Sequence, residues 1–439
     1  MQGLLKLLGK KIKIGGTIVP DPDIQQVEEP DRVVIPLDYP GHIHYLPVVE
    51  IGDSVRKGQV IGKSRIGNCA FATISGTIKD ITSVWTAQSV HSPAVVIEQN
   101  GEAPLSPQEI FGDPVPLFDA KAALNRIRLA GVNAPWTLSG RDYREGEISK
   151  LPPIEKVVIT GVDEEPTIFK SQLLLEQNSQ RVLEGLKKVN TLLPNAQVWL
   201  TVPGHMEDWA KEQFSEYAEI LPLAQSYRVR IHREVIAYIT GKRVSIRDSY
   251  IKHGIAVQDV EYLLAMLDAL DGSSPFLQKY LTISGSGLEK AITVRFPLGS
   301  SLKHVLTSQG LEVSDYTRPV VGGPMKGIAQ YSELTPLTHN DGIYLIKEDV
   351  APSDLIAPCI NCGRCARICP AKIQVHLVNR MIEFGQTESA KSLHSEACHE
   401  CGLCGHVCPA ERPIVQLIRF CNSDMVLGAR HTWEAGGQK

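Results

Sequence analysis

The chain has 439 residues, of which 43% are apolar, 21% are charged and 6% are aromatic, and its formal net charge is −4. This length predicts several domains, and the near-neutral charge argues against a nucleic-acid binder that depends on phosphate contacts. No apolar run reaches the roughly 18 residues of a membrane-spanning helix. Eight of the ten cysteines lie between Cys359 and Cys408, which indicates a metal centre in a reducing compartment rather than a disulfide framework. We therefore expect a cytoplasmic protein.

Residues 1–32 are a predicted N-terminal segment, and residues 33–105 are a predicted first domain. In this domain apolar and polar residues alternate and glycines are frequent, which is typical of short strands joined by tight turns. Two related halves favour a lipoyl-like barrel-sandwich hybrid. The carrier form of that fold needs a lysine on a hairpin flanked by methionines, and the sequence has none, so we expect a structural platform.

Cys69 lies in this first domain, where a loop passes into a strand. A lone cysteine at such a place is usually a small buried residue. The alternative is a redox-active thiol, which needs surroundings that stabilise the thiolate. The sequence leaves both interpretations open.

Residues 120–270 alternate between short apolar strands and amphipathic helices, a pattern that predicts a mostly parallel α/β sheet. The expected strands include 156–160, 197–202 and 254–257, and one helix is expected over 172–189. Ligands of parallel sheets bind at the carboxyl ends of the strands. The segment 160–166 is therefore the place to look for a binding site.

Residues 275–335 are a predicted β-grasp-like domain, with two strands, a helix and a glycine-rich strand and turn. The turn is Gly322-Gly323-Pro-Met-Lys-Gly327. A tight structural turn is the favoured interpretation, and close approach to a ligand is the alternative.

Residues 345–428 are a predicted domain that contains two cysteine runs of identical spacing, C-x2-C-x2-C-x3-C-P. This is the spacing of bacterial ferredoxins, in which the fourth cysteine of each run ligates the cluster of the other run. The sequence therefore predicts two [4Fe–4S] clusters. One ligand set is Cys359, Cys362, Cys365 and Cys408, and the other is Cys398, Cys401, Cys404 and Cys369.

Zinc is the alternative metal for these runs, because pairs of the C-x-x-C type also bind zinc. Zinc sites use looser spacing and rarely repeat this run twice, which favours iron–sulfur clusters. Apolar residues at helical spacing follow each run, over 373–388 and 413–420. They indicate an α-helical ferredoxin domain.

In this order the parts resemble the RnfC family, which supplies one of the subunits of the Rnf electron-transport complex. The markers are the two cysteine runs and the segments 15–20, 161–166, 238–243 and 322–327. The resemblance implies a multidomain α+β fold. Its parts are a lipoyl-like barrel-sandwich hybrid, an α/β domain similar to the FMN- and NADH-binding subunit of respiratory complex I, a β-grasp (SLBB) domain and an α-helical two-cluster ferredoxin domain.

The family's flavin and nucleotide site is the part from which this sequence departs. Residues 130–142 correspond to the family's glycine-rich flavin loop, but Trp136 and Leu138 would fill space that the cofactor needs. Asp259 stands where the family has asparagine, which adds repulsion toward phosphate. We therefore expect FMN and NADH binding to be weakened or absent. The vestigial site would retain Glu164, Glu165, Gly322 and Gly323.

The leading hypothesis is an iron–sulfur electron-transfer subunit with protein partners, such as a dehydrogenase, a flavoprotein or a reductase. The partner complex would place it in the cytoplasm or at the cytoplasmic side of a membrane. One alternative is an NADH:acceptor oxidoreductase that uses FMN. Another is an electron donor to proline reductase, since one branch of the family serves that enzyme and carries a redox thiol in the barrel, where this chain has Cys69. A third is a bridging protein. The sequence leaves open whether the chain is itself an enzyme.

Overall fold

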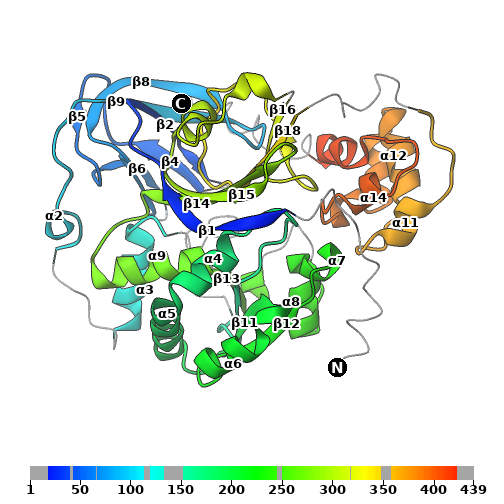
Figure 1. Cartoon of the computed structure of the whole chain (residues 1–439), viewed down its shortest axis with the longest axis horizontal. Helices are drawn as coiled ribbons and strands as arrows, with labels where there is room; N and C mark the ends of the chain where they lie inside the picture. The colour runs from blue at the N-terminus through cyan, green and yellow to red at the C-terminus, as the bar shows by residue number, and fades with distance from the viewer. Residues whose placement is uncertain are drawn as a thin grey trace, which may run out of the picture. The chain divides into compact units, whose positions relative to one another are not determined.

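The computed structural model of the chain (Figure 1) describes residues 18–39, 43–65, 67–112, 119–132, 152–244, 250–316, 318–347 and 357–422. The chain divides into two compact units. The N-terminal unit comprises Met1–Arg230 and Tyr250–Lys347, and the C-terminal unit comprises Ile231–Ser249 and Glu348–Lys439. Within the described ranges, no helix has both the length and the apolar character needed to cross a membrane.

Two four-stranded sheets form the first part of the N-terminal unit. The first sheet has the order β2 (Arg32–Pro36), β9 (His91–Gln99), β8 (Gly76–Trp85) and β5 (Ser54–Val55). The second has the order β3 (Asp38–Tyr39), β4 (Ile43–Pro47), β6 (Val60–Ser64) and β7 (Cys69–Phe71). Alternate side chains of both sheets, such as Val33 and Ile61, are fully buried in one shared core. The arrangement agrees with the barrel-sandwich hybrid expected from the sequence.

A parallel four-stranded sheet forms the centre of the α/β part, drawn in green in Figure 1. Its order is β12 (Glu219–Leu223), β11 (Gln197–Pro203), β10 (Lys156–Thr160) and β13 (Ile255–Asp259). The helices that share its core are α3 (Ala120–Leu129), α4 (Lys170–Gln177), α5 (Ser179–Leu192), α6 (Glu207–Phe214) and α9 (Val260–Asp271). Because all four strands run in one direction, their carboxyl ends lie along one edge.

The helix expected over 172–189 is two helices, which is a correction to the sequence-based prediction. Asn178 separates α4 from α5 with φ −120° and ψ 30°, outside the helical region. Its side-chain amide donates to the carbonyl oxygen of Leu174 at 3.1 Å, so the side chain caps the first helix. Asparagine forms such local bonds readily, and they compete with a continuous helix.

A six-stranded sheet forms the third part of the N-terminal unit. Its order is β1 (Val19–Gln26), β15 (Lys290–Pro297), β14 (Gln278–Gly285), β18 (Gly342–Ile346), β16 (Arg318–Val321) and β17 (Ile328–Ala329), with helix α10 (Leu302–Thr307) packed in its core. Strands β1 and β18 lie outside the expected range of 275–335. They pair in parallel with β15 and β14, so the N-terminal segment and residues beyond 335 complete this sheet.

The C-terminal unit is helical among its described residues, and it includes a helix from the middle of the chain. Its helices are α8 (His232–Thr240), α11 (Arg364–Ile368), α12 (Val375–Glu383), α13 (Thr387–Ser392), α14 (Leu403–His406) and a last helix over 414–422. The sequence placed α8 in the range 120–270. However, Arg243 donates to the carbonyl oxygen of Pro370 at 3.5 Å, and His399 lies 3.8 Å from Glu234, so α8 belongs with the cysteine-rich segment.

Short elements complete the two units. They are α2 (Pro107–Phe111), α7 (Tyr227–Arg230) and the 3-10 turns η3 (Gly204–Met206), η4 (Tyr250–His253), η5 (Val313–Asp315) and η6 (Ser395–Ala397).

We predict that Gly76→Ala destabilises the barrel part. Gly76 begins β8 between two neighbouring strands, and an added Cβ would lie 2.2 Å from the carbonyl oxygen of Glu98. Such a clash costs about 1–3 kcal/mol. Urea unfolding followed by circular dichroism measures the loss, with Thr77→Ala in the same strand as control. Equal midpoints for the two variants would contradict the prediction.

Candidate functional site

The first cysteine run passes from an extended segment into a short helix. Its first two cysteines precede Gly363, which has a φ of 68° in the left-handed region. Helix α11 follows and contains Cys365, and Cys369 is its C-cap. Glycine adopts this conformation without strain, so the chain turns directly from the first ligands into the helix.

The second run repeats this local structure. Gly402, with a φ of 77°, precedes α14 as Gly363 precedes α11. The same offset along the chain relates two further pairs of residues with positive φ, Asn361 with Glu400 and Lys372 with Glu411. Helices α11 and α14 pack against each other, so the two runs face one another within the C-terminal unit.

The fourth cysteine of each run lies beside the first three cysteines of the other run. Burial raises the pKa of Cys365, and the nearby thiols of Cys408 and Cys359 raise it further. The pKa of Cys404 is likewise raised by burial, by Cys398 and Cys401, and by Cys369. A cavity in this unit is lined by Cys359, Cys362, Cys365 and Cys408.

The spacing of the sulfur atoms argues against zinc. A tetrahedral zinc ion with Zn–S bonds of about 2.3 Å holds its sulfurs about 3.8 Å apart. Among the described residues, the only group of three potential ligand atoms within 4.8 Å of one another consists of carboxylates, so no three cysteine sulfurs are that close. A cube of iron and sulfide ions separates its ligands more widely than a single ion does.

Backbone amides already point at several of these sulfurs. The amide of Glu400 donates to Cys398 Sγ at 3.3 Å. Burial raises the pKa of Cys365 and Cys404, and the amides of Ala366 and Gly405 act against this by donating to the two sulfurs. Amide hydrogen bonds to sulfur stabilise cluster ligands and set reduction potentials. The residues present therefore fit iron–sulfur clusters.

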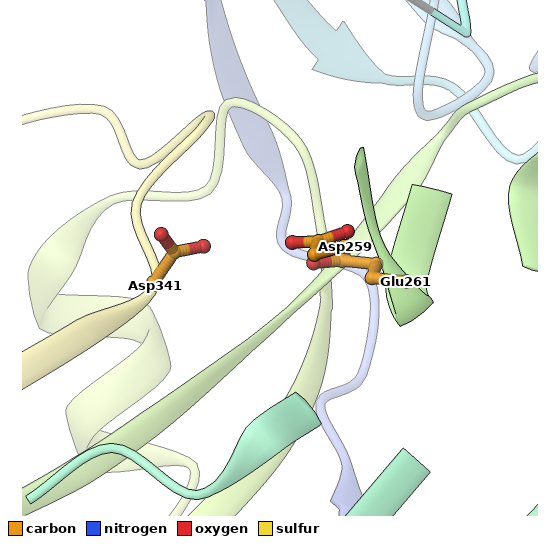
Figure 2. A group of neighbouring side chains, drawn as sticks. All are labelled: Asp259, Glu261 and Asp341. Atoms are coloured by element: carbon orange, nitrogen blue, oxygen red, sulfur yellow. The ribbon is translucent and has the colours of Figure 1, made fainter. Parts of the chain in front are cut away.

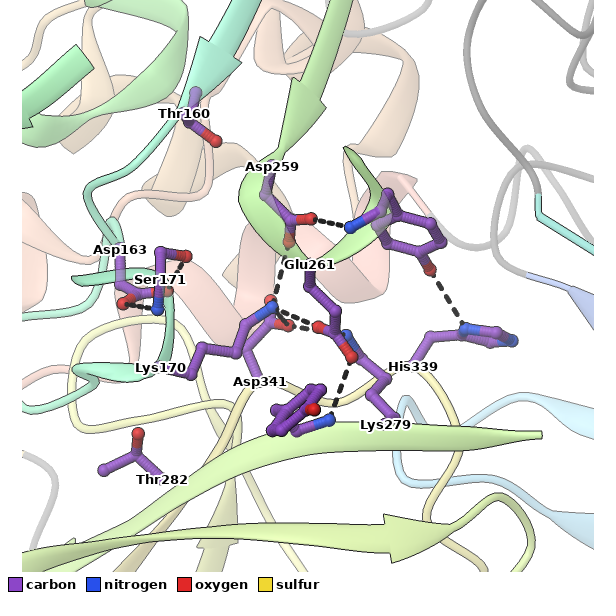
Figure 3. Close-up of polar contacts among 12 residues, drawn as sticks. Thr160, Asp163, Lys170, Ser171, Asp259, Glu261, Lys279, Thr282, His339 and Asp341 are labelled. Carbon is purple, nitrogen blue, oxygen red and sulfur yellow. Dashed lines mark hydrogen bonds and ion pairs between the residues drawn. The ribbon is translucent and has the colours of Figure 1, made fainter. Parts of the chain in front are cut away.

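The carboxyl edge of the parallel sheet contains a second group of functional side chains, the carboxylate–lysine network. It consists of Lys170, Lys279, Asp259, Glu261 and Asp341 (Figure 3). Its members come from α4, β14, the end of β13, α9 and the loop before β18. Both lysines are 1% exposed.

Lys170 is the centre of this network. Its Nζ lies 2.9 Å from Asp259, 2.6 Å from Glu261 and 3.0 Å from Asp341. The Lys279 ammonium lies 2.7 Å from Glu261 and 3.1 Å from Asp341. Burial alone would lower the pKa of Lys170, but the surrounding carboxylates raise it well above its usual value. Both lysines are therefore held in the charged form.

The three carboxylates of the network face one another, as Figure 2 shows, with oxygen atoms within 4.8 Å. That spacing would suit a metal ion. The two ammonium groups lie within hydrogen-bond distance of the same oxygens and provide the counter-charge that a cation would provide.

Glu164, Glu165, Gly322 and Gly323 are brought together by the structure, as the sequence led us to expect. Glu165 accepts hydrogen bonds from the amides of Met325 and Lys326 at 3.0 and 2.6 Å, and Glu164 pairs with the Lys326 ammonium at 3.0 Å. A Cβ on Gly323 would lie 2.7 Å from the Glu165 carboxyl group, so glycine permits this contact. The four residues thus close a loop over the sheet edge. Burial raises the pKa of Glu165 to about 7 despite the two amides.

Backbone amides at this edge donate to the chain's own carboxylates. Besides the two at Glu165, the amides of Ser171, Tyr262 and Tyr280 donate to Asp163, Asp259 and Glu261 at 2.8, 2.9 and 2.9 Å. Amides of this kind are what a parallel α/β sheet offers to a phosphate group. The described residues at this edge therefore do not fit a flavin phosphate. Most of the expected flavin loop, including Trp136 and Leu138, lies outside the described residues.

Cys69 lies in the second sheet of the barrel and is 6% exposed. It packs with Phe71 and Leu277. Burial raises the pKa of its thiol more than Lys63 and Arg128 lower it. These surroundings favour the thiol over the thiolate and are typical of a structural cysteine.

The comparison with family models identifies both ends of this architecture. Residues 17–102 match the RnfC barrel sandwich hybrid domain, and residues 358–412 match a 4Fe-4S dicluster domain. The chain belongs to the RnfC family. The second match covers both cysteine runs, so iron–sulfur clusters are the cofactors of this part of the protein.

Curated relatives of the family are similar over most of the chain. The corresponding subunit of the ion-translocating oxidoreductase complex of Pseudomonas aeruginosa is 28% identical, over 80% of this chain and 46% of that protein. Its counterpart in the proton-translocating ferredoxin:NAD(+) oxidoreductase complex of Clostridium ljungdahlii is 27% identical, over 90% of this chain and 88% of that protein. The chain thus spans about half the length of the first relative and most of the second.

One solved structure has a related arrangement. It is that of an NAD+-reducing [NiFe]-hydrogenase in the H2-reduced state, with 16% identity and a TM-score of 0.46 over 75% of this chain and 69% of that chain. A similarity at this level carries no argument about this RnfC-family chain.

The carboxylate–lysine network was missed by sequence reasoning, apart from Asp259. A lysine at the start of a helix or within a strand is normally exposed, so Lys170 and Lys279 did not stand out. The two lysines gain their role only when α4 and β14 meet at the sheet edge.

We predict that double substitutions reveal which cysteines share a cluster. Cys365→Ala/Cys408→Ala removes two ligands from one expected set and none from the other, so about four iron atoms should remain from about eight. The control Cys365→Ala/Cys369→Ala removes one ligand from each set and should leave no intact cluster. Iron and sulfide analysis with EPR spectroscopy measures both, and the reverse pattern would mean that each run binds its own cluster.

We predict that Lys170→Met strongly destabilises the N-terminal unit. The substitution leaves three carboxylates with one ammonium group, and breaking a buried ion pair costs about 3–5 kcal/mol. The control is Lys303→Met, because Lys303 pairs with Glu333 at the surface and such pairs contribute at most about 1 kcal/mol. Urea unfolding measures both. A loss for Lys170→Met no larger than that of the control would show that Lys279 alone satisfies the carboxylates.

Proposed function

We propose that this chain is the iron–sulfur electron-transfer subunit of an ion-translocating oxidoreductase complex of the Rnf type. The observation that carries the proposal is the pair of four-cysteine groups in a member of the RnfC family. Each bound [4Fe–4S] cluster accepts and releases one electron at a time. The chain's own residues hold the ligands in place, surround them with apolar groups and donate amide hydrogen bonds to the sulfurs.

The ligand sets of the proposal are those expected from the spacing. Cys359, Cys362, Cys365 and Cys408 hold one cluster, and Cys398, Cys401, Cys404 and Cys369 hold the other. Because each run contributes to both clusters, the two clusters are held close together. Short separation favours electron transfer between them.

Other subunits of the complex are the proposed partners. The relatives named above are subunits of complexes that translocate ions, and one of these complexes is a ferredoxin:NAD(+) oxidoreductase. By this analogy the chain acts at the cytoplasmic side of a membrane complex and exchanges electrons with protein partners. The β-grasp (SLBB) and complex I-like interpretations of the other two sheets belong to the same proposal, with assembly as their role.

The alternative function, an NADH dehydrogenase with FMN, receives less support. The amides of Ser171, Met325 and Lys326 donate to carboxylates of the chain, and Asp259 is held by Lys170. A flavin phosphate at this edge would have to displace these contacts against negative charge. Electron donation to proline reductase through Cys69 is also less supported, because that thiol is buried and its pKa is raised.

We predict that protein purified without oxygen contains about eight iron atoms and about eight sulfides per chain. Reduction by dithionite should produce the EPR spectrum of [4Fe–4S] clusters. Incubation with FMN followed by gel filtration should leave no flavin on the protein, and NADH should not reduce the clusters. One zinc ion with little iron would contradict the proposal, and a retained flavin that NADH bleaches would favour the alternative.

A further inference from the structure

The two ligand groups differ in their access to solvent. Cys369, Cys398, Cys401 and Cys404 are all buried, at 6–7% exposure. Cys359 is exposed, and the other three members of its group are intermediate. An electron carrier that docks on the protein can therefore come close to the first group, whereas the second group is surrounded by protein.

Arginines surround the exposed group. Arg364 and Arg380 line the same cavity as its four cysteines, and Arg367 packs beside Gly363. All three arginines are exposed, and no ion pair holds them among the residues that the structure describes. The acidic residue that lines the cavity, Glu383, is paired with Arg412. The edge therefore carries an excess of positive charge from the protein side chains.

An apolar side chain lies within this ring of charge. Ile360 follows Cys359, lines the cavity and is 65% exposed. An apolar centre with a charged rim is the usual composition of a protein-docking site.

We propose that this edge, formed by Cys359, Ile360, Arg364, Arg367 and Arg380, docks an acidic electron-carrier protein. The inference rests on the proposed function, since it assigns electron exchange to the group of Cys359. Positive charge around the contact attracts a negatively charged carrier over a distance of about a Debye length and speeds its association. Ile360 would be covered when the carrier docks, and the separation between carrier and cluster would then be short.

Salt dependence tests the docking charge without any substitution. The probe is a bacterial [4Fe–4S] ferredoxin of strongly negative net charge, and the control probe is cytochrome c, a basic carrier. Stopped-flow association with the iron-loaded full chain should slow about tenfold or more between low salt and about 0.5 M salt for the ferredoxin. Cytochrome c should not associate measurably. A rate that salt leaves unchanged, or faster association of cytochrome c, would overturn the proposal.

Charge reversal then locates the surface. The triple variant Arg364→Glu/Arg367→Glu/Arg380→Glu should slow ferredoxin association at low salt by about tenfold or more. The control triple variant, Arg32→Glu/Lys121→Glu/Arg318→Glu, changes the net charge equally at exposed positions of the N-terminal unit. It should retain most of the wild-type rate. Equal slowing in the two triple variants would show that only total charge matters and would overturn the proposal.

Iron content and reduction potential separate the possible failures. If the charge-reversed chain retains about eight irons but has a shifted potential and unchanged ferredoxin binding, the arginines balance the charge of the cluster and the docking proposal is wrong. If the wild-type chain holds no iron, the proposed function itself fails. Ile360→Ala provides a milder variant that keeps every charge. It should raise the dissociation rate of the ferredoxin several-fold, and an unchanged rate would remove Ile360 from the surface.

Discussion

The ammonium group of Lys170 contacts carboxylates from the end of a parallel strand, from the helix that follows it and from the loop before β18. Lys279 joins two of these carboxylates from the six-stranded sheet. A buried charge is tolerated only when opposite charges surround it, so these segments must meet in one arrangement. The network therefore fixes the α/β sheet against the six-stranded sheet. It also occupies the edge where a sheet of this kind ordinarily presents amides to a ligand.

The same constraint acts on sulfur in the C-terminal unit. Burial disfavours ionised thiols, and the pKa of Cys398 is raised to about 12 in the absence of a counter-charge. Metal binding releases the protons of such thiols and couples ligand ionisation to the stability of the fold. In the N-terminal unit lysines provide the positive charge, whereas in the C-terminal unit iron is expected to provide it. The chain thus uses internal counter-ions where relatives of the parallel-sheet class bind phosphate.

Local features of this fold could be predicted from the sequence, and long-range ones could not. The cysteine spacings and the apolar strand 156–160 are contained in short windows, so their interpretation needed no partner. Strand β1 is found only by its pairing with β15, far along the chain. The break at Asn178 depends on one side-chain hydrogen bond within an otherwise helical pattern. Lys170 gives no warning at all, because its role arises from residues that the chain brings together from distant positions.

Helix α8 belongs to the C-terminal unit although it is made long before the cysteine runs. Val235, Ile236 and Ile239 of this helix are buried, so its apolar face needs the later segment as a cover. During synthesis the helix must therefore wait until the last part of the chain has left the ribosome. Cofactor insertion is consequently a late event, tied to completion of the polypeptide. A fragment that begins after residue 347 lacks this helix and would expose the surface on which it packs.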